Sequence, residues 1–280
     1  FYEMSRLNQG RAAFYEVSEK YIPVYLDLGM TLIKIGEEAK VPIETFTLEG
    51  SAGKDFRYTV RNVEKKGYRF EIVSGEEVLR LMPELRRISD AWLQMKAGKE
   101  KRFSIGFFDE KYLSNFPIAL VRNDSEIVAF ANIWTGAEKE EISVDLMRYG
   151  PNAPYRTMEY LFIKLMLWGK EMGYKHFSLG MAPLSGLENR QFAPIWHKIG
   201  SLIFSHGEHF YNYRGVREFK EKFNPVWSPR YIALPKGFKQ GLVLKDIAAL
   251  ISGGVKGIFT KENKRAISHR GHQTPEKTLE

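Results

Sequence analysis

The sequence predicts an α/β fold with mixed sheets, and three patterns support this prediction. Amphipathic segments with helical spacing alternate with short apolar runs that Gly, Pro and Asn residues bound. Two apolar runs joined by the polar Asn123-Asp124 turn predict a β-hairpin. A long apolar helix then precedes another buried strand, which is typical of a parallel crossover. With 44% hydrophobic residues in 280, the chain can bury a substantial core, which excludes wholesale disorder.

Residues 1–74 are predicted to form a first domain. Its opening segment, "GRAAFYEVSEKYIPVYLDLGMTLIKIG", predicts a helix followed by a strand around Tyr25 to Leu28. The segment "GKDFRYTVRNVEKKG" predicts a helix that Gly67 ends, and "YRFEIV" predicts a strand. Because this region is short and starts at Phe1, we expect its opening strands to lie upstream, which makes the domain incomplete.

Residues 75–240 are predicted to form a second domain that opens with the helix "GEEVLRLMPELRRISDAWLQMK". The second run of the hairpin, Ile127 to Trp134, is apolar on both alternating faces, as expected for a central strand covered on both sides. The segment "EISVDLMRY" predicts a third strand. Alternation divides its residues into two faces: Ile142, Val144 and Leu146 on one, and Ser143, Asp145 and Met147 on the other.

The rest of the second domain follows two prolines, Pro151 and Pro154. We expect a helix from about Thr157 to Met172, the strand "HFSLG", the loop "MAPLSGLENR" and a helix near "FAPIWHKIG". The strand "HFYNY", a basic helix and a closing strand "RYIAL" complete it, and residues 241–280 offer a short apolar helix and a basic tail. This order is that of an acyltransferase-type α/β domain, and the first region repeats its later half, so two related domains are predicted.

The charge balance and the absence of cysteine limit the classes of function. A formal net charge of +8 favours anionic partners: nucleic acid, anionic lipid or phosphorylated small molecules. The chain has no cysteine, which excludes disulfides, thiol nucleophiles and thiolate metal sites. The segment "HGEH" does not match a helical zinc motif, and no Walker lysine is present. We therefore expect neither a metal nor a cofactor.

The segment "YNYRGVREFKEKFNPVWSPRYIALPKG" has the densest mixture of cations and aromatic residues in the chain. On a helical projection Lys220 is the charge closest to the apolar face of Val216, Phe219 and Phe223. An inward lysine needs an anion, or a route by which its stem reaches water, and the pattern leaves both possibilities open. The other cations fit a solvated surface one by one, but their density beside aromatic rings indicates a phosphate- and base-binding surface. They are Arg214, Arg217, Lys222 and Arg230.

Asp145 is predicted to lie in the middle of a strand among apolar neighbours, where a carboxylate without a partner would be costly. It should bind a cation, either a structural arginine or an amine of the substrate. On a straight strand Arg148 would face the opposite side, because three residues is an odd step. A β-bulge could bring both side chains to one face. The pattern fits a structural salt bridge and a functional site equally well.

Three long motifs, "SVDLMRYGPNAPYRTMEYLF", "GYKHFSLGMAPLSGL" and "HGEHFYNYRGVREFKEKFNPVWSPRYIA", resemble the C-terminal domain of the bacterial multiple peptide resistance factor. The resemblance runs from about Gly75 to Leu234. It implies two tandem GNAT-like domains, of which the first is truncated here. In the full-length protein they would be attached to a transmembrane flippase region and would lie at the cytoplasmic face of the bacterial cell membrane. It also implies transfer of lysine or alanine from aminoacyl-tRNA to phosphatidylglycerol, which makes the lipid less anionic and gives resistance to cationic antimicrobial peptides.

In that family the Asp and Arg of "DLMRY" and the Lys of "FKEKF" are functional, which here are Asp145, Arg148 and Lys220. Some relatives have arginine where Lys222 stands. Ordinary GNAT enzymes carry a pyrophosphate-binding loop before the crossover helix. This chain has "RYGPNAP", whose prolines remove amide donors, so acetyl-CoA is not the expected donor.

The resemblance suggests transesterification, with a lipid hydroxyl attacking the aminoacyl ester. Lys220 would bind the tRNA 3′ end or the oxyanion, and Asp145 would hold an ammonium group or polarise the hydroxyl. Arg148 would orient Asp145 or bind phosphate. Lys222, Arg214, Arg217 and Arg230 would grip tRNA, and the apolar run from Ile247 to Ile258 would meet the membrane surface. Asp145, Glu188 and Glu208 would form the amino-acid pocket.

Lysine is favoured over alanine as the transferred amino acid, so the expected partners are Lys-tRNA and phosphatidylglycerol on an anionic membrane surface. Three alternatives stay open at this point. They are an alanyl-phosphatidylglycerol synthase, a peptidoglycan-bridge aminoacyltransferase with a peptide amine as acceptor, and a non-enzymatic module that binds tRNA or membranes.

Overall fold

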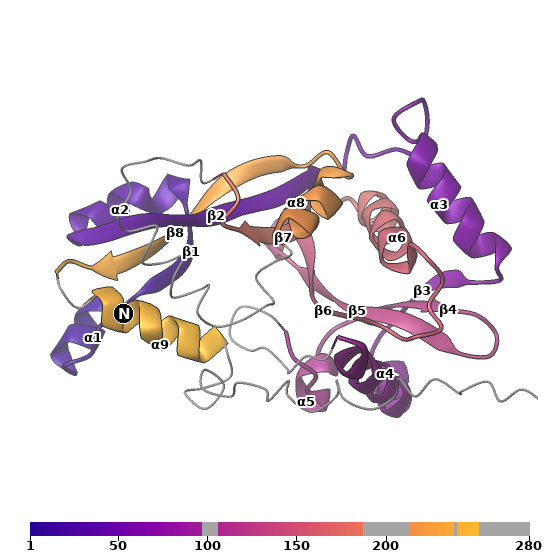
Figure 1. Ribbon diagram of the computed structural model, residues 1–280, viewed down its shortest axis with the longest axis horizontal. Coiled ribbons are helices and arrows are strands. Elements are labelled where there is room, and N and C mark those ends of the chain that lie inside the picture. The colour runs from indigo at the N-terminus through magenta and orange to yellow at the C-terminus, as the bar shows by residue number, and fades with distance from the viewer. Residues whose placement is uncertain (97–105, 187–212, 238–239, 252–280) are drawn as a thin grey trace, which may run out of the picture.

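The computed structural model describes residues 1–96, 106–186, 213–237 and 240–251 (Figure 1). Within these ranges eight strands form one mixed sheet in the order β1-β8-β2-β7-β6-β5-β4-β3. The strands are β1 (Phe14–Ser18), β2 (Met30–Pro42), β3 (Arg69–Val73), β4 (Ile118–Arg122), β5 (Ile127–Thr135), β6 (Glu141–Tyr149), β7 (His176–Pro183) and β8 (Val226–Pro235).

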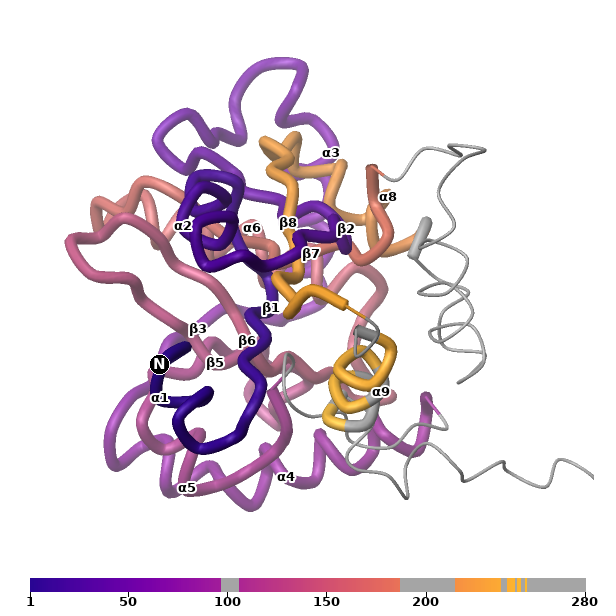
Figure 2. The backbone as a smooth tube through the Cα atoms, turned by 90° about the vertical axis from the view of Figure 1, so that its left-hand side faces the viewer, coloured from indigo at the N-terminus to yellow at the C-terminus, as the bar shows by residue number. Residues whose placement is uncertain are grey.

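Helices lie on both faces of the sheet, and Figure 2 shows α4 and α5 on the side opposite α2, α3 and α6. They are α1 (Tyr2–Leu7), α2 (Ile22–Asp27), α3 (Lys54–Lys65), α4 (Glu76–Met95), α5 (Glu110–Leu113), α6 (Thr157–Glu171), α8 (Tyr213–Glu221) and α9 (Gln240–Ile251). Two short 3₁₀ helices, η1 (Glu19–Tyr21) and η2 (Ala137–Lys139), precede α2 and β6. None of the described helices is long and apolar enough to span a bilayer.

The sheet separates two main cores. On the α6 side Phe162 contacts the rings of Phe177, Phe219 and Phe223, with centroids 5.7 to 6.0 Å apart. On the α4 side Leu85, Leu120 and other buried residues pack together. Burial of an aromatic or aliphatic side chain of this size contributes about 1.5–3 kcal/mol, so Phe219 of α8 and Phe223 just after it help to hold α8 on the sheet.

Most predicted elements of the second domain are confirmed. The hairpin is β4 and β5, the predicted third strand is β6, and β5 is a buried central strand. The crossover helix is α6, after which β7 pairs with β6 in parallel. All other pairings in the sheet are antiparallel. The basic helix is α8 and the closing strand is β8.

The prediction for the opening segment was wrong. The residues around Tyr25 to Leu28 form α2, which has Pro23 at its start and ends before Gly29, whose φ is +71°. Strands lie on both sides of this helix, and the longer one, the 13-residue β2, was missed. Proline is favoured in the first turn of a helix, and glycine is favoured just after one, so both residues could have indicated α2.

The predicted boundary at residue 74 stays a prediction, and strands from both sides of it share the sheet. β3 pairs with β4, while β2 pairs with β7 and β8. The predicted helix near "FAPIWHKIG", the predicted strand "HFYNY" and most of the tail lie outside the described residues.

Candidate active site

Strands β6 and β7 pair only at their beginnings, and this places the candidate site. The parallel register runs from Glu141 opposite His176 to Ser143 opposite Ser178. Beyond that point β6 continues to Tyr149 beside β5, and β7 continues to Pro183 beside β2. Residues 144–149 of β6 and residues 179–183 of β7 therefore do not pair with each other, and we call these two stretches the β6–β7 divergence. Main-chain groups that face the divergence do not bond the other strand, so side chains or ligands can bond them.

A β-bulge in β6 opens at Asp145. Opposite β5 the register jumps between Ala131, which faces Met147, and Ile133, which faces Val144. Asp145 and Leu146 therefore lie opposite Asn132 alone. The fully buried Asn132 accepts hydrogen bonds from both main-chain amides through Oδ1, at 3.3 Å from Asp145 N and 2.7 Å from Leu146 N. This side chain supplies the acceptor that a regular ladder would have provided.

The bulge puts Asp145 and Arg148 on the α4 side of the sheet. This agrees with the prediction that a β-bulge could bring both side chains to one face. The Asp145 carboxylate accepts a hydrogen bond of 2.6 Å from the hydroxyl of Tyr112 in α5. The Arg148 guanidinium stacks on Trp92 of α4, 4.1 Å from its centroid. The predicted face of Ile142, Val144 and Leu146 was wrong for Leu146, which packs in the α4 core because of the bulge.

In the described part of the chain the Asp145 carboxylate contacts neutral groups. Tyr112 donates to Asp145 and in turn accepts from Trp134 Nε1 at 3.1 Å. Burial, and then the Asp145 carboxylate beside it, raise the pKa of Tyr112 to about 12, so its hydroxyl keeps its proton near neutral pH. Gly106 lies so close to the carboxylate that a Cβ there would overlap it. Tyr112 and Trp134 were not predicted from the sequence, whereas Asn132 could have been noticed as the polar residue in an apolar strand.

Lys220 reaches the other border of the divergence. It is 8% exposed, which confirms the predicted inward orientation, and its amine donates to the carbonyls of Gly180, at 2.9 Å, and Met181, at 2.8 Å. Gly180 has a φ of +76° and lies in a bulge of β7, two residues beyond the last β6–β7 pair. Asp145 is likewise two residues beyond that pair on β6. Asp145 thus lies on one strand that borders the divergence, and Lys220 of α8 contacts the other.

Burial disfavours the charged form of this amine. The pKa of Lys220 falls to about 8, mainly through burial, although the carboxylates of Glu16 and Glu38 raise it in part. An ammonium group has three donors, and two of them are taken by the carbonyls. One N–H therefore remains for an anionic or carbonyl oxygen.

The predicted phosphate-binding cations have acidic partners. Lys222 pairs with the buried Glu159 at 2.8 Å, where Thr59 also donates at 2.7 Å. Arg217 pairs with Glu37 at 2.7 Å and lies over Trp227. Arg230 pairs with Glu38. The Arg214 side chain, Glu188 and Glu208 lie outside the described residues.

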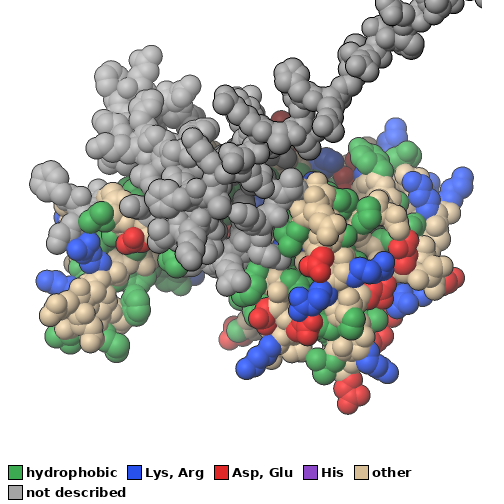
Figure 3. Space-filling model, turned by 60° about the horizontal axis from the view of Figure 1, so that its bottom comes forward, with side chains coloured by type: hydrophobic (Ala, Val, Ile, Leu, Met, Phe, Trp, Pro, Cys, Tyr) green, Lys and Arg blue, Asp and Glu red, His purple; other side chains and the backbone are tan. Residues whose placement is uncertain are grey.

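The surface beside α4 and α5 carries both signs of charge. Figure 3 shows Lys and Arg side chains interspersed with Asp and Glu over the described part of this face. In the same ranges no three His, Asp or Glu residues are grouped so that they could hold a metal ion.

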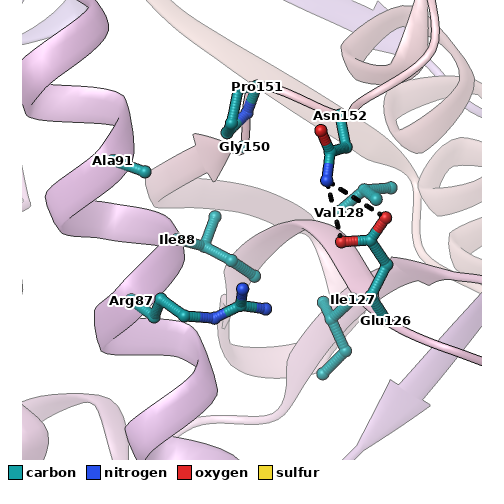
Figure 4. A pocket seen from close by; sticks show the side chains of 9 residues that line it. All are labelled: Arg87, Ile88, Ala91, Glu126, Ile127, Val128, Gly150, Pro151 and Asn152. Atoms are coloured by element: carbon teal, nitrogen blue, oxygen red, sulfur yellow. Dashed lines mark hydrogen bonds between the residues drawn. The ribbon is translucent and has the colours of Figure 1, made fainter.

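A small pocket lies apart from these residues, between α4, the start of β5 and the turn after β6 (Figure 4). Asn152 donates to the carboxylate of Glu126 across it, at 3.2 and 3.4 Å. Arg87 projects from α4 toward the same space (Figure 4). None of the predicted site residues lines this pocket.

The chain is similar to a known protein family and to individual relatives. Residues 1–234 match the family described as "Phosphatidylglycerol lysyltransferase, C-terminal". The chain is 39% identical over 245 residues to the phosphatidylglycerol lysyltransferase of Bacillus subtilis (strain 168), covering 87% of this chain and 28% of that protein. It is 34% identical over 224 residues to the Staphylococcus aureus (strain COL) enzyme of the same name, covering 80% of this chain and 26% of that one. The chain thus spans about a quarter of the length of these relatives.

Solved structures agree. The C-terminal domain of a putative lysylphosphatidylglycerol synthetase from Agrobacterium fabrum has a TM-score of 0.79 and 40% identity, covering 92% of this chain and 78% of that one. L-PGS from Bacillus licheniformis has a TM-score of 0.75 and 37% identity, covering 90% and 76%. FemX, at 10% identity, covering 88% and 76%, shares the fold alone, with a TM-score of 0.56. This chain belongs to the family of phosphatidylglycerol lysyltransferase C-terminal domains.

Proposed function

We propose that this chain transfers lysine from Lys-tRNA to a glycerol hydroxyl of phosphatidylglycerol. The observation that carries the proposal is the family match over residues 1–234, together with an acid on β6 and an amine from α8 that contacts β7 across the β6–β7 divergence. The names of the relatives supply the lysyl group and the lipid.

The reaction exchanges one ester for another. The glycerol oxygen attacks the aminoacyl carbonyl carbon, the bond from that carbon to the tRNA ribose oxygen breaks, and the proton of the glycerol hydroxyl passes to the ribose oxygen. Since the donor is already an activated ester, positioning and charge stabilisation supply the catalysis.

Each site residue receives a role from its contacts. Lys220 has one N–H left after its two carbonyl bonds, and we assign this N–H to the oxygen that becomes negative during attack. The Oδ2 atom of Asp145 is occupied by Tyr112, so Oδ1 is left for the attacking hydroxyl or the α-ammonium group. Arg148 is 6% exposed and stacked on Trp92, which favours a role in orienting β6 over phosphate binding.

Some features of the whole protein remain part of this proposal. We infer two tandem GNAT-like domains, of which this chain holds the second and part of the first. The relatives are more than three times as long as the matched region, which is consistent with an attached membrane region that holds the domain at the cytoplasmic face of the membrane. The lysylated lipid would carry less negative charge and repel cationic antimicrobial peptides.

A transfer assay tests the function directly. The chain is incubated with phosphatidylglycerol vesicles and tRNA charged with labelled lysine or labelled alanine, and the lipid fraction is counted. We expect lysine to enter the lipid, and Asp145→Ala and Lys220→Ala to lose most of this transfer. Alanine entering in its place would indicate an alanyl-phosphatidylglycerol synthase. Label that prefers an added lipid-linked peptide amine would indicate a peptidoglycan-bridge enzyme, and binding without transfer a non-catalytic module.

A further inference from the structure

Glu16 occupies a strained position on β1. The register against β8 jumps between Phe14, opposite Ala233, and Val17, opposite Tyr231, so two residues of β1 lie opposite one of β8. Glu16 is one of these two, and its φ is +59°. A left-handed backbone is unfavourable for a residue with a Cβ, by about 1 kcal/mol or more. A bulge also redirects the side chain that it carries.

The strand register places Glu16 near charged groups of β8 and β2. Ser18, two residues after Glu16, lies opposite Arg230, and Arg230 pairs with Glu38. Burial, and then the carboxylate of Glu38, raise the pKa of Glu16, while the cations of Arg230 and Lys220 lower it in part. The side chain nevertheless remains exposed to solvent. A ligand can therefore reach this carboxylate.

The other acid of this cluster is already occupied. Glu38 accepts from Ser178 at 3.0 Å and pairs with Arg230. For Glu16 the described part of the chain supplies neither a hydrogen bond nor an ion pair. The fold therefore gains little from this carboxylate, since it sits on a strained backbone beside a second negative charge. A cationic ligand bound to the carboxylate would offset this cost.

We propose that Glu16 binds the side-chain ammonium of the lysyl group and thereby selects lysine. This assignment rests on the proposed function, which supplies a cation with a long arm. In that function the carbonyl carbon is held between Asp145 and Lys220. From the neighbouring Cα an extended lysine side chain reaches roughly 6 Å by standard bond lengths. Glu16 and Lys220 are close enough for their charges to interact, and β1 lies on the β7 side of the divergence, beyond β2 and β8.

Binding of two small esters isolates this interaction from catalysis. L-Lysine methyl ester and L-norleucine methyl ester share the α-amine, the ester and a four-carbon side chain, and only the first carries the terminal ammonium. We expect the 280-residue chain to bind the lysine ester at least tenfold more tightly, as measured by calorimetry. Glu16→Gln should remove this preference and leave the affinity for the norleucine ester unchanged.

Two further variants control for structural effects. Glu16→Gly suits the positive φ, so it should fold at least as stably as the wild type and still lose the lysine preference. Glu19→Gln, an exposed acid three residues away, should keep the preference.

The proposal is overturned if wild type binds the two esters equally, or if both Glu16 variants retain the preference or weaken both esters alike. Failure of the proposed function has a different signature. A wild-type preference for the lysine ester that Glu16→Gln removes, without lysine transfer to lipid, would leave Glu16 as the ammonium site and reject the lipid acceptor.

Discussion

The two strands that border the β6–β7 divergence hold their charged groups by different means. On β6 the Asn132 side chain accepts from the main-chain amide of Asp145, and the described partner of the Asp145 carboxylate is the neutral Tyr112 hydroxyl. Around β7 and α8 the cations Arg217, Lys222 and Arg230 each have a carboxylate within ion-pair distance. Neutral partners fix a carboxylate without cancelling its charge, whereas an ion pair leaves little charge for a ligand. The contrast directs attention from the basic segment as a whole to Asp145, Lys220 and Glu16.

The largest effect is expected from Asn132→Ala, because it removes the acceptor that holds the β6 bulge. Two main-chain amides would lose their partner, at a cost of about 1–3 kcal/mol for each group left buried. We expect a loss of about 3 kcal/mol in the free energy of unfolding, measured with urea. Lysine transfer should fall more than 100-fold, because Asp145 is no longer presented toward α5.

A matched asparagine provides the control. Asn123 also accepts hydrogen bonds from two main-chain amides, those of Ser125 and Glu126 at 2.9 Å, but in an exposed turn. Asn123→Ala should cost less than about 1 kcal/mol, since water can replace the lost acceptor, and should leave transfer unchanged. Equal losses in the two variants would mean that the bulge has no special role.

Lys220→Met tests the amine that contacts β7 at the divergence, and its effect on the free energy of unfolding depends on pH. The folded-state pKa of about 8 is below the ordinary value of 10.5, so the folded protein releases this proton before the unfolded chain does. Between pH 8 and 10.5 the unfolded state binds more protons, and stability must rise with pH. Relative to Lys220→Met, the wild type should gain up to about 3 kcal/mol over this window, measured by urea unfolding at pH 7.5 and 10.

Transfer should follow the opposite trend. Only the charged amine stabilises a developing oxyanion, so wild-type activity should decline above pH 8 while the residual activity of Lys220→Met, about 100-fold lower near neutral pH, stays flat. A decline of the same shape in both proteins would assign the titration to another group.

Much of the fold could be predicted because its signals are local. The Asn123-Asp124 turn, the apolar stripe of α6 and the inward Lys220 each depend on residues close in sequence. The register shifts could not be predicted in this way. Whether β6 bulges at Asp145 is decided by Asn132, thirteen residues earlier on the paired strand. The importance of Glu16 depends on charges contributed by β2, β8 and α8.

The opening segment, before residue 42, also could not be predicted from local sequence patterns. Pro23 and Gly29 mark the two ends of α2, yet apolar residues over six positions fit a strand equally well. β2 has charged residues at Lys34, Glu37 and Glu38, which obscured its strand pattern. In the structure Lys34 pairs with Glu37 on the same strand, Glu37 also pairs with Arg217 of α8, and Glu38 pairs with Arg230 of β8. A central strand can therefore contain them.

Tyr112→Phe should have a moderate effect on the β6 side. It deletes the hydroxyl that donates to Asp145, while the ring contacts with Phe116 remain. We expect transfer to fall about tenfold, equivalent to about 1.4 kcal/mol, with the substrate KM nearly unchanged. Because the pKa of Tyr112 is about 12, this ratio should be constant from pH 7 to 10. Trp134→Phe removes only the donor to Tyr112, so transfer should fall only a few-fold. A larger loss of transfer than in Tyr112→Phe would contradict the proposal that Trp134 acts through Tyr112.

The smallest effect is expected from Lys222→Ala, which distinguishes tRNA binding from a structural ion pair. Its partner Glu159 is 2% exposed and also has Thr59 and Arg156 nearby, so stability should fall by only about 1 kcal/mol. tRNA affinity, measured by filter binding over a series of salt concentrations, should change less than twofold. A cation that contacts phosphate releases a counterion, so its removal lowers the salt slope by about one. An unchanged slope in Lys222→Ala would confirm that Glu159 neutralises this lysine, and a slope reduced by one would return it to the tRNA surface.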